Sequence, residues 1–328
     1  RRKKRKAGMR GGSGYTGGEL IRLLLPHPYV EIAFVQSNRQ EGKKLYEAHR
    51  ALQGETDMTF SSSHNSAIQV LFLCGGHDAA KKFMNENKLD ACTVVIDLSQ
   101  DFRHHVNNTI AGRNFVYGLP ELNREKIASA KSIANPGCFA TCIELALLPL
   151  AHANKLSNEI HVNATTGSTG AGQALSDTTH FTWRDSNVSV YKMFTHQHLK
   201  EINESLRLLQ PGFNGEIFFV PQRGNFTRGI FASVYQKSDL SLQELEALYS
   251  DYYSAHPFVT ISKKELDVKQ VVNTNRCFLH LEKHGGNVLI TSAIDNLLKG
   301  ASGQAVQNMN LIFGFDEKTG LQLKPSAF

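Results

Sequence analysis

The sequence predicts an α/β protein of two domains, because its 328 residues are enough for two separate cores. In the first part, short apolar runs alternate with stretches of helical period, which indicates a parallel sheet covered by helices on both faces. After residue 138, strand-like runs follow one another with fewer helices between them. This second pattern indicates an α+β domain, with a mixed or antiparallel sheet and helices on one side.

Each expected element follows from a run of residues with the matching period. In the first part we expect a helix over 17–28, ended by two prolines, and strands over 30–37, 70–75 and 92–99. In the second part we expect strands over 159–167, 215–222, 229–237 and 287–295, and an amphipathic helix over 241–256. A last helix over 299–314 is expected to pack back on the first domain. The predicted domains are 1–137 with 299–328, and 138–298.

Composition excludes several kinds of partner. No apolar run approaches the roughly 20 residues that span a bilayer, so we expect no membrane contact. The net charge of +6 is supplied by six basic residues among the first seven, and no basic face runs through the rest, so we expect no nucleic-acid partner. The N-terminus is charged rather than apolar, and the five cysteines lack a framework spacing. Both features favour the cytoplasm.

A glycine-rich turn stands near the N-terminus. The stretch "GGSGYTGGEL" (11–20) contains G-x-G-x-x-G at Gly12, Gly14 and Gly17, and it opens the first expected helix. Such a turn lets the backbone approach a pyrophosphate, which then rests on the helix N-terminus. A plain tight turn is the alternative, but the βαβ pattern that follows favours a Rossmann-type dinucleotide site.

The end of the second expected strand indicates which dinucleotide would bind. A site for NAD usually carries an acidic residue there, whereas this chain has Ser37 and Arg39. A hydroxyl and a guanidinium suit a 2′-phosphate, so we expect NADP. Arg10, by contrast, falls within the expected buried strand, where an unpaired charge costs several kcal/mol. Either its side chain reaches the cofactor phosphates, or the strand is shortened or strained.

Cys138 is the candidate nucleophile. It follows a Pro-Gly pair and opens an apolar run of helical length, so the thiol is expected at a helix start, where the dipole favours a thiolate. His196 and His198 share one face if their segment is extended, so that one relays protons while the other orients substrate. Metal binding is the rival reading of such a pair, but no further cluster has ligand spacing, so we expect no metal. A buried structural thiol is the alternative for Cys138.

Four further motifs carry a resemblance to a known family. They are "DLSQDFR" (97–103), "NPGCFAT" (135–141), "YKMFTHQHLKEI" (191–202) and "DNLLKGASGQAVQNMN" (295–310). Together with the glycine turn, and in this order over nearly the whole chain, they resemble the N-acyl-γ-glutamyl-phosphate reductases of arginine biosynthesis, especially the Bacteroidetes form. That family is related to the semialdehyde and glyceraldehyde-3-phosphate dehydrogenases. The resemblance implies a second domain of the glyceraldehyde-3-phosphate dehydrogenase-like kind, which carries catalysis and forms a homodimer or homotetramer.

The resemblance also assigns roles to residues. It implies that Cys138 is the nucleophile, that His196 and His198 are the catalytic pair, and that Arg103 and Tyr191 hold the substrate phosphate or carboxylate. The residues that match the family's cofactor site are Gly12, Ser13, Gly14, Tyr15, Thr16 and Gly17 in the turn, and Lys299 and Gly300 near the nicotinamide and pyrophosphate. Ser37 and Arg39 remain the candidates for the 2′-phosphate.

The implied activity is that of an NADP-dependent phosphorylating aldehyde dehydrogenase. It reduces N-acetyl- or N-succinyl-γ-glutamyl phosphate, a small acyl phosphate, to the glutamate 5-semialdehyde through a thioester on Cys138, with release of phosphate. A related dehydrogenase acting on another acyl phosphate, such as aspartyl phosphate, is the nearest alternative. A regulator that uses the basic start of the chain and a thiol hydrolase without cofactor are the alternatives from other classes. The width of the pocket decides between the two acyl groups, so both stay open.

Overall fold

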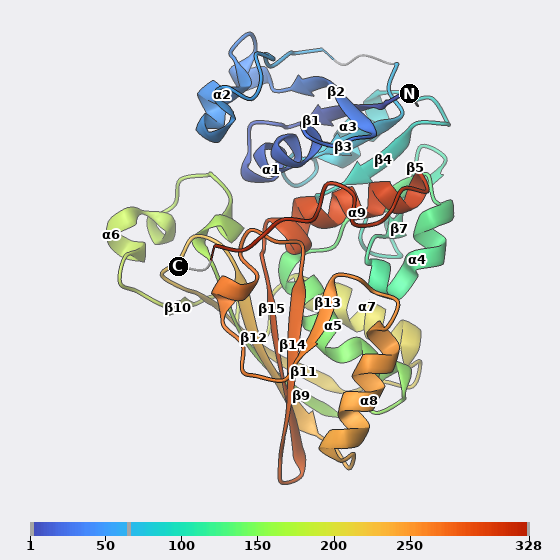
Figure 1. Ribbon diagram of the computed structural model, residues 1–328, viewed down its shortest axis with the longest axis vertical. Helices are drawn as coiled ribbons and strands as arrows, with labels where there is room; N and C mark the ends of the chain where they lie inside the picture. The colour runs from blue at the N-terminus through green and yellow to red at the C-terminus, as the bar shows by residue number, and fades with distance from the viewer. Residues whose placement is uncertain (1–2, 64–66, 327–328) are drawn as a thin grey trace. The chain divides into compact units, whose positions relative to one another are not determined.

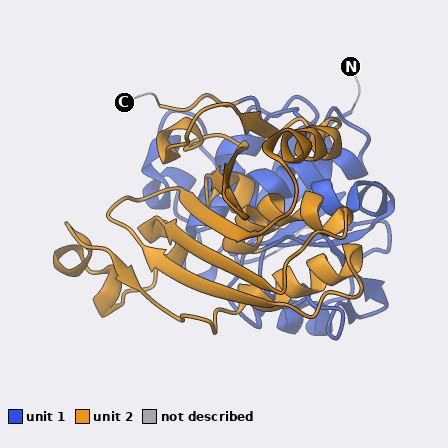
Figure 2. Cartoon of the chain, turned by 90° about the horizontal axis from the view of Figure 1, so that it is seen from below, with its two compact units in different colours: residues 1–136, 301–322 blue, residues 137–300, 323–328 orange. Residues whose placement is uncertain are grey.

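The computed structural model describes residues 3–63 and 67–326, and these residues form two compact units. Unit 1 comprises Arg1–Pro136 and Ala301–Gln322, and unit 2 comprises Gly137–Gly300 and Leu323–Phe328, as coloured in Figure 2. The chain therefore returns from unit 2 to unit 1 after residue 300, whereas the predicted boundary follows residue 298. The prediction also placed residues 323–326 in the first domain, but they belong to unit 2.

Hydrogen bonds explain these shifted boundaries. The Gly300 N–H donates to the carbonyl of Asp295 at 3.0 Å, which holds the segment 299–300 within unit 2. The Asn273 side-chain amide donates to the Lys324 carbonyl at 3.1 Å, which fixes the end of the chain to the same unit.

In the described part of the chain, unit 1 is built on a six-stranded parallel sheet (Figure 1). In sheet order its strands are β2 (Val30–Gln36), β1 (Arg5–Arg10), β3 (Val70–Leu73), β4 (Val94–Asp97), β8 (Ser132–Ala134) and β7 (Val116–Tyr117). β3 and β4 are buried at every position, as expected for strands covered on both faces. The strand order reverses between β1 and β3, and ligands of such sheets bind at the carboxyl ends beside this point.

The helices of unit 1 pack around this sheet. They are α1 (Tyr15–Leu24), α2 (Leu45–Ala48), α3 (Ala79–Glu86), α4 (Pro120–Ser129) and α9 (Gly303–Ile312), and a small hairpin of β5 (Thr109–Ile110) and β6 (Arg113–Asn114) joins them. α1 begins at Tyr15 rather than at residue 17, and it ends at Leu24, just ahead of the two prolines, which lack N–H groups. α9 contacts α1 and α4, which confirms that the last helix packs on the first unit.

Part of the basic start of the chain belongs to the sheet. Arg5 and Lys6 lie in β1 and Lys3 and Lys4 precede it, whereas Arg1 and Arg2 lie outside the described residues. β1 extends to Arg10, with a register shift against β2 between Ala7 and Gly8. The strand is therefore not shortened at Arg10.

Within residues 137–300, all of them described, unit 2 contains a seven-stranded mixed sheet. In sheet order its strands are β10 (Ser189–Val190), β11 (Glu216–Arg223), β9 (Glu159–Thr166), β12 (Ile230–Lys237), β15 (Asn287–Ile294), β14 (Cys277–His284) and β13 (Val259–Ser262). The β11–β9 and β13–β14 pairs are parallel and the others are antiparallel, so the mixed alternative is correct. β14 pairs with β15 in the long hairpin of Figure 1, and the sequence analysis missed it.

The larger helices of unit 2 lie on one face of this sheet. They are α5 (Cys138–His152), α7 (His198–Leu209) and α8 (Leu242–Tyr253), and the short α6 (Phe181–Arg184) stands apart from them (Figure 1). α5 contacts β12, β14 and β15, while α7 packs on α5 and α8 contacts β13 and β14. Pro149 inside α5 cannot donate to the Leu145 carbonyl, and the Tyr253 hydroxyl donates to that carbonyl instead at 2.5 Å.

None of the helices in the described residues is long and apolar enough to cross a bilayer.

Candidate active site

Cys138 is the first residue of α5, as the sequence predicts. Gly137 caps the helix in an extended conformation, and the Thr141 N–H donates to its carbonyl at 2.9 Å. The half-buried thiol therefore lies at the positive end of a 15-residue helix, where a thiolate is favoured. All five cysteines are described, and each is a free thiol.

Glu201 connects this helix start to the histidine pair. Its side chain is 2% exposed, and its Oε2 accepts a hydrogen bond from the Gly137 N–H at 2.9 Å. Its Oε1 lies 3.9 Å from Nε2 of His198. Glu201 was assigned no role from the sequence, although its i+3 spacing from His198 at a helix start was visible.

The histidine pair is close together, but not for the expected reason. The segment is a turn that leads into α7, and Gln197 has helical dihedral angles, so the predicted extended conformation is wrong. The rings of His196 and His198 nevertheless lie with centroids 4.6 Å apart. A Cβ on Gly137 would lie 2.4 Å from Nε2 of His198, so a glycine is required there for the ring to pack beside the start of α5.

His196 is a neutral side chain at neutral pH. Burial, followed by the neighbouring His198 and Lys192, lowers the pKa of His196 from 6.5 to about 3, against an opposing effect of Glu201. Its Nδ1 accepts a hydrogen bond from the His198 N–H at 3.1 Å, so the proton of the neutral ring is on Nε2.

Tyr191 lies in the same cluster and brings with it an arginine that the sequence analysis missed. The Tyr191 ring is 5.8 Å from that of His196, and burial, together with nearby Cys138, raises the pKa of Tyr191 to about 12. The Arg223 guanidinium lies 4.6 Å from the Tyr191 ring centroid, in a cation–π contact. Among the described residues the buried Nε of Arg223 has no hydrogen-bond partner. The sequence signal for Arg223 was its place at the end of β11, directly before Gly224.

Lys299 and Gly300 belong to unit 2, in a π-helical turn (Leu298–Ser302) that precedes α9. Lys299 is fully buried. A Cβ on Gly300 would lie 2.9 Å from the Cβ of Cys138, so this glycine packs directly against Cys138 within unit 2.

The glycine turn of unit 1 has the geometry that a dinucleotide needs. A Cβ on Gly17 would lie 2.6 Å from the Gly12 backbone, and one on Gly12 would lie 2.2 Å from the Val35 side chain, so both glycines permit close packing of α1 on the sheet. Gly14 caps α1, and its Cβ position has no described atom within 4 Å. Gly11, which the predicted motif did not include, has a φ of +74°. These observations fit a pyrophosphate at the start of α1.

The other predicted turn residues surround this helix start. Tyr15 is exposed, and the Thr16 carbonyl accepts a hydrogen bond from the Ser302 hydroxyl at 2.8 Å. The Ser37 hydroxyl donates to that of Ser13 at 3.1 Å, which connects the end of β2 to the turn. Ser37 and Arg39 line a cavity of about 200 Å³ at the carboxyl ends of β1, β2 and β3, as expected for a site at the 2′-position of a bound nucleotide.

Arg103 is held within unit 1 by two backbone carbonyls. Its Nε donates to the Asn135 carbonyl at 2.9 Å, and an Nη donates to the Leu98 carbonyl at 3.1 Å. It follows β4, whose last residue, Asp97, is fully buried. Burial raises the pKa of Asp97 to about 7, although its hydrogen bonds from Ser99 and the charge of Arg103 oppose that rise. Arg103 belongs to unit 1 and Tyr191 to unit 2.

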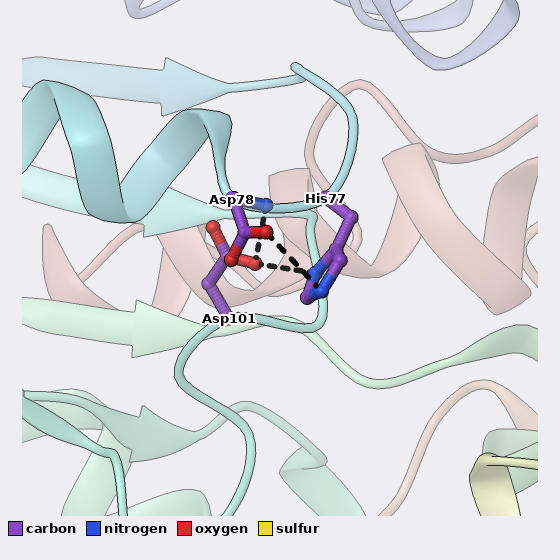
Figure 3. A group of neighbouring side chains, drawn as sticks. All are labelled: His77, Asp78 and Asp101. Carbon is purple, nitrogen blue, oxygen red and sulfur yellow. Dashed lines mark hydrogen bonds and ion pairs between the residues drawn. The ribbon is translucent and has the colours of Figure 1, made fainter.

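His77, Asp78 and Asp101 form a group at the start of α3 with ligand atoms within 4.8 Å of one another (Figure 3). Asp101 Oδ1 accepts from the Asp78 N–H at 3.0 Å, and its Oδ2 accepts from the Lys81 N–H at 3.1 Å. Nδ1 of His77 lies 3.1 Å from the same Oδ1. These hydrogen bonds give Asp101 a structural role as the cap of α3.

The fold and the two sites define a class of protein, an NAD(P)-dependent dehydrogenase with a thiol at a helix start. Family models described as the semialdehyde dehydrogenase NAD binding domain and the semialdehyde dehydrogenase dimerisation domain match residues 6–130 and 138–296. An N-acetyl-gamma-glutamyl-phosphate reductase of Flavobacterium johnsoniae is 55% identical over 98% of the chain and 99% of the relative. One of Azobacteroides pseudotrichonymphae is 57% identical over the same shares. The chain belongs to the N-acetyl-gamma-glutamyl-phosphate reductase family.

Solved structures agree on the fold. Aspartate semialdehyde dehydrogenase II of Vibrio cholerae aligns with a TM-score of 0.71 at 17% identity, covering 95% of this chain and 99% of that one. The aspartate semialdehyde dehydrogenase of Candida albicans aligns with a TM-score of 0.73 at 15% identity, covering 94% and 98%. At these identities the likeness extends to architecture alone.

Proposed function

We propose that the chain reduces an N-acyl-γ-glutamyl phosphate, with NADPH, to the corresponding glutamate 5-semialdehyde and phosphate. The observation that carries this proposal is the cluster at the start of α5, where Glu201 connects Gly137, next to Cys138, with the histidine pair. The names of the relatives at 55% and 57% identity support the N-acetyl substrate in particular.

Cys138 begins the reaction as a thiolate. Its sulfur attacks the γ-carbonyl carbon of the acyl phosphate, the carbon–oxygen bond to phosphate breaks, and a thioester forms as phosphate leaves. Backbone N–H groups in the first turn of α5 stabilise the oxyanion that develops during the attack. The Gly137 N–H does not take part, because it donates to Glu201.

The histidines have different tasks. His198 accepts the thiol proton and later returns it to sulfur when the aldehyde leaves, which its position beside Gly137 and the carboxylate of Glu201 favours. His196 stays neutral and orients its neighbour through the bond to the His198 N–H. When bound, NADPH supplies the hydride for the carbonyl carbon.

Two arginines and a tyrosine hold the anionic groups of the substrate. Arg103, with its guanidinium fixed by two carbonyls, and Tyr191 are the anchors for the phosphate or the carboxylate. Arg223 is a further anchor beside Tyr191 in unit 2, because its Nε is buried there and a bidentate anion would satisfy it.

The cofactor is NADP rather than NAD. β2 ends at Gln36, and the residues that follow it, Ser37 and Arg39, offer a hydroxyl and a positive charge where an NAD site offers a carboxylate. The pyrophosphate rests on the start of α1, where Gly14 leaves room for it. Lys299 and Gly300 of unit 2 are further cofactor residues, as the family resemblance implies.

The active form is a homodimer or homotetramer assembled through unit 2, in the cytoplasm. His161 stacks between Phe218 and Tyr235 on the sheet face that the larger helices leave uncovered, at centroid distances of 5.1 and 4.9 Å. Residues 175–194 add exposed apolar side chains, among them Phe181 and Trp183. Five free thiols suit a reducing compartment.

The test is the reverse reaction. Purified protein is given NADP⁺, phosphate and, separately, the semialdehydes of N-acetylglutamate, N-succinylglutamate and aspartate. We expect phosphate-dependent formation of NADPH with an N-acylglutamate semialdehyde, and the faster of the two names the acyl group. Turnover with aspartate semialdehyde alone would favour the rival dehydrogenase, and turnover without phosphate would rule out the acyl-phosphate chemistry.

A further inference from the structure

The cavity beside Ser37 contains a second arginine that the family resemblance does not assign. Arg10 lines it together with Ser37, Asn38, Arg39 and Phe83, and its volume is about 200 Å³. Its position at the carboxyl ends of β1, β2 and β3 is where nucleotides bind in doubly wound sheets.

The alternation of β1 explains how Arg10 reaches this cavity. Ala7 and Met9 are fully buried on one face of the sheet, and Gly8 and Arg10 belong to the other. On the Gly8 face a Cβ would lie 2.4 Å from the Phe34 ring, in the core cluster that also contains Phe83 of α3. Arg10, two residues further along, therefore emerges beside α3 at the edge of that core.

The guanidinium of Arg10 is fixed by stacking. Its central carbon lies 4.2 Å from the centroid of the Phe83 ring, which is within the range of a cation–π contact. The side chain is half-buried, so it is removed from bulk water but keeps its edge open to the cavity that it lines. An arginine stacked in this way offers a preorganised row of N–H donors.

The positive charges that line the cavity favour binding of an anion. Arg10 and Arg39 contribute two guanidinium groups and Ser37 a hydroxyl, whereas no carboxylate is among the described residues that line it. Burial lowers the pKa of Arg10, and Glu86 of α3 acts in the opposite direction from outside the lining. A phosphate monoester carries a charge of about −1.5 to −2 at neutral pH, which matches two guanidinium groups.

We propose that Arg10 is a specificity-determining residue that binds the 2′-phosphate of NADP opposite Arg39. The inference rests on the proposed function, since it names a residue for the cofactor site of the same reaction. Arg10 and Arg39 approach the phosphate from β1 and from the end of β2, and the Ser37 hydroxyl turns from Ser13 to donate to it between them. Arg10 therefore strengthens discrimination of NADPH from NADH beyond what Arg39 provides.

Calorimetric titration of the full chain tests this role without turnover. The probes are adenosine 2′,5′-bisphosphate, which carries the phosphate in question, and adenosine 5′-monophosphate, which lacks it. We expect Arg10→Met to weaken binding of the bisphosphate roughly 10- to 100-fold, the range for a lost hydrogen bond to a charged group, and to change binding of the monophosphate less than about threefold. Arg10→Lys should fall between the two proteins, because it keeps the charge but loses the planar fork.

Controls separate this inference from the proposed function. Arg22→Met removes an arginine of unit 1 that pairs with Glu19 on α1, and it should bind both probes like the wild type. Circular dichroism checks the fold, and Arg10→Gln replaces Arg10→Met if the latter does not fold. An equal loss for both probes would mean that Arg10 stacks on the adenine, and no loss would mean no contact, so either result overturns the inference alone. A wild type that does not prefer the bisphosphate would overturn the NADP assignment as well.

Discussion

The carboxylate of Glu201 connects the start of α5 to the histidine pair. Its two carboxylate oxygens contact the Gly137 N–H and the His198 ring. We expect Glu201→Gln to lower kcat roughly 10- to 100-fold with little change in KM, because the amide keeps an acceptor for Gly137 but loses the charge that stabilises a protonated His198.

The acidic limb of the kcat profile should also move in Glu201→Gln, which a merely structural loss would not produce. Glu216→Gln, at the exposed start of β11, is the matched control and should leave both parameters unchanged. A variant with wild-type kcat and pH profile would remove Glu201 from the positioning role.

The buried, neutral state of His196 predicts a dependence of stability on pH. Its pKa of about 3 lies below the ordinary value of 6.5, so the unfolded chain binds more protons between these values. The contribution of His196 is therefore present above about pH 6.5 and is lost as the pH falls towards 3.

Denaturant unfolding of the wild type and His196→Gln measures this contribution. We expect the difference in free energy of unfolding between the two proteins to shrink as the pH falls from about 7 to 4. Asp97, whose pKa is raised to about 7, has the opposite dependence, but it is common to both proteins and cancels in the difference. A constant difference for His196→Gln would contradict the assignment.

At the scale of elements, the glycines of the turn have different tasks: Gly17 permits close packing, whereas Gly14 leaves room for the cofactor. Gly17→Ala would place a methyl group 2.6 Å from the Gly12 backbone, so we expect it to destabilise the protein by about 1–3 kcal/mol. Gly14→Ala meets no described atom within 4 Å and has a compatible φ of −81°, so it should fold normally but bind NADP⁺ at least roughly tenfold more weakly.

Thermal unfolding and calorimetric titration of the two variants distinguish these effects. If Gly14→Ala binds NADP⁺ like the wild type, the pyrophosphate does not approach the turn at that position.

The strands and helices that the sequence predicted are those with a strong local period. β2 and β9 were placed within one residue of their observed bounds, because apolar alternation or an unbroken apolar run marked them. β14 was missed because polar residues fill its second half, although its pairing with β15 is local: His284 lies opposite Asn287 across a two-residue turn. The cysteine at the start of α5 was predictable from a Pro-Gly pair, whereas the contacts of Glu201 and Arg223 arise only when separate elements meet.

At the scale of the whole molecule, the uncovered face of the unit 2 sheet predicts self-association. Tyr235 is 38% exposed and stacks on His161 across neighbouring strands. We expect Tyr235→Glu to shift the mass in solution from a multiple of 36.4 kDa towards that of a single chain, because a charge would be buried in the interface.

Size-exclusion chromatography with light scattering measures this shift. Tyr29→Glu, at an exposed aromatic position of unit 1, is the control and should keep the wild-type mass. A wild type that is monomeric at micromolar concentrations would contradict assembly through this face.

The central claim is that Cys138 carries the acyl group between the release of phosphate and the reduction. The most direct measurement mixes the protein with N-acetyl-γ-glutamyl phosphate in the absence of NADPH, quenches in acid, and determines phosphate and the mass of the intact chain. We predict a burst of about one phosphate per chain and an acyl adduct that peptide mapping assigns to Cys138, both absent in Cys138→Ser. Release of phosphate without an adduct on Cys138, or an adduct that persists in Cys138→Ser, would contradict this account.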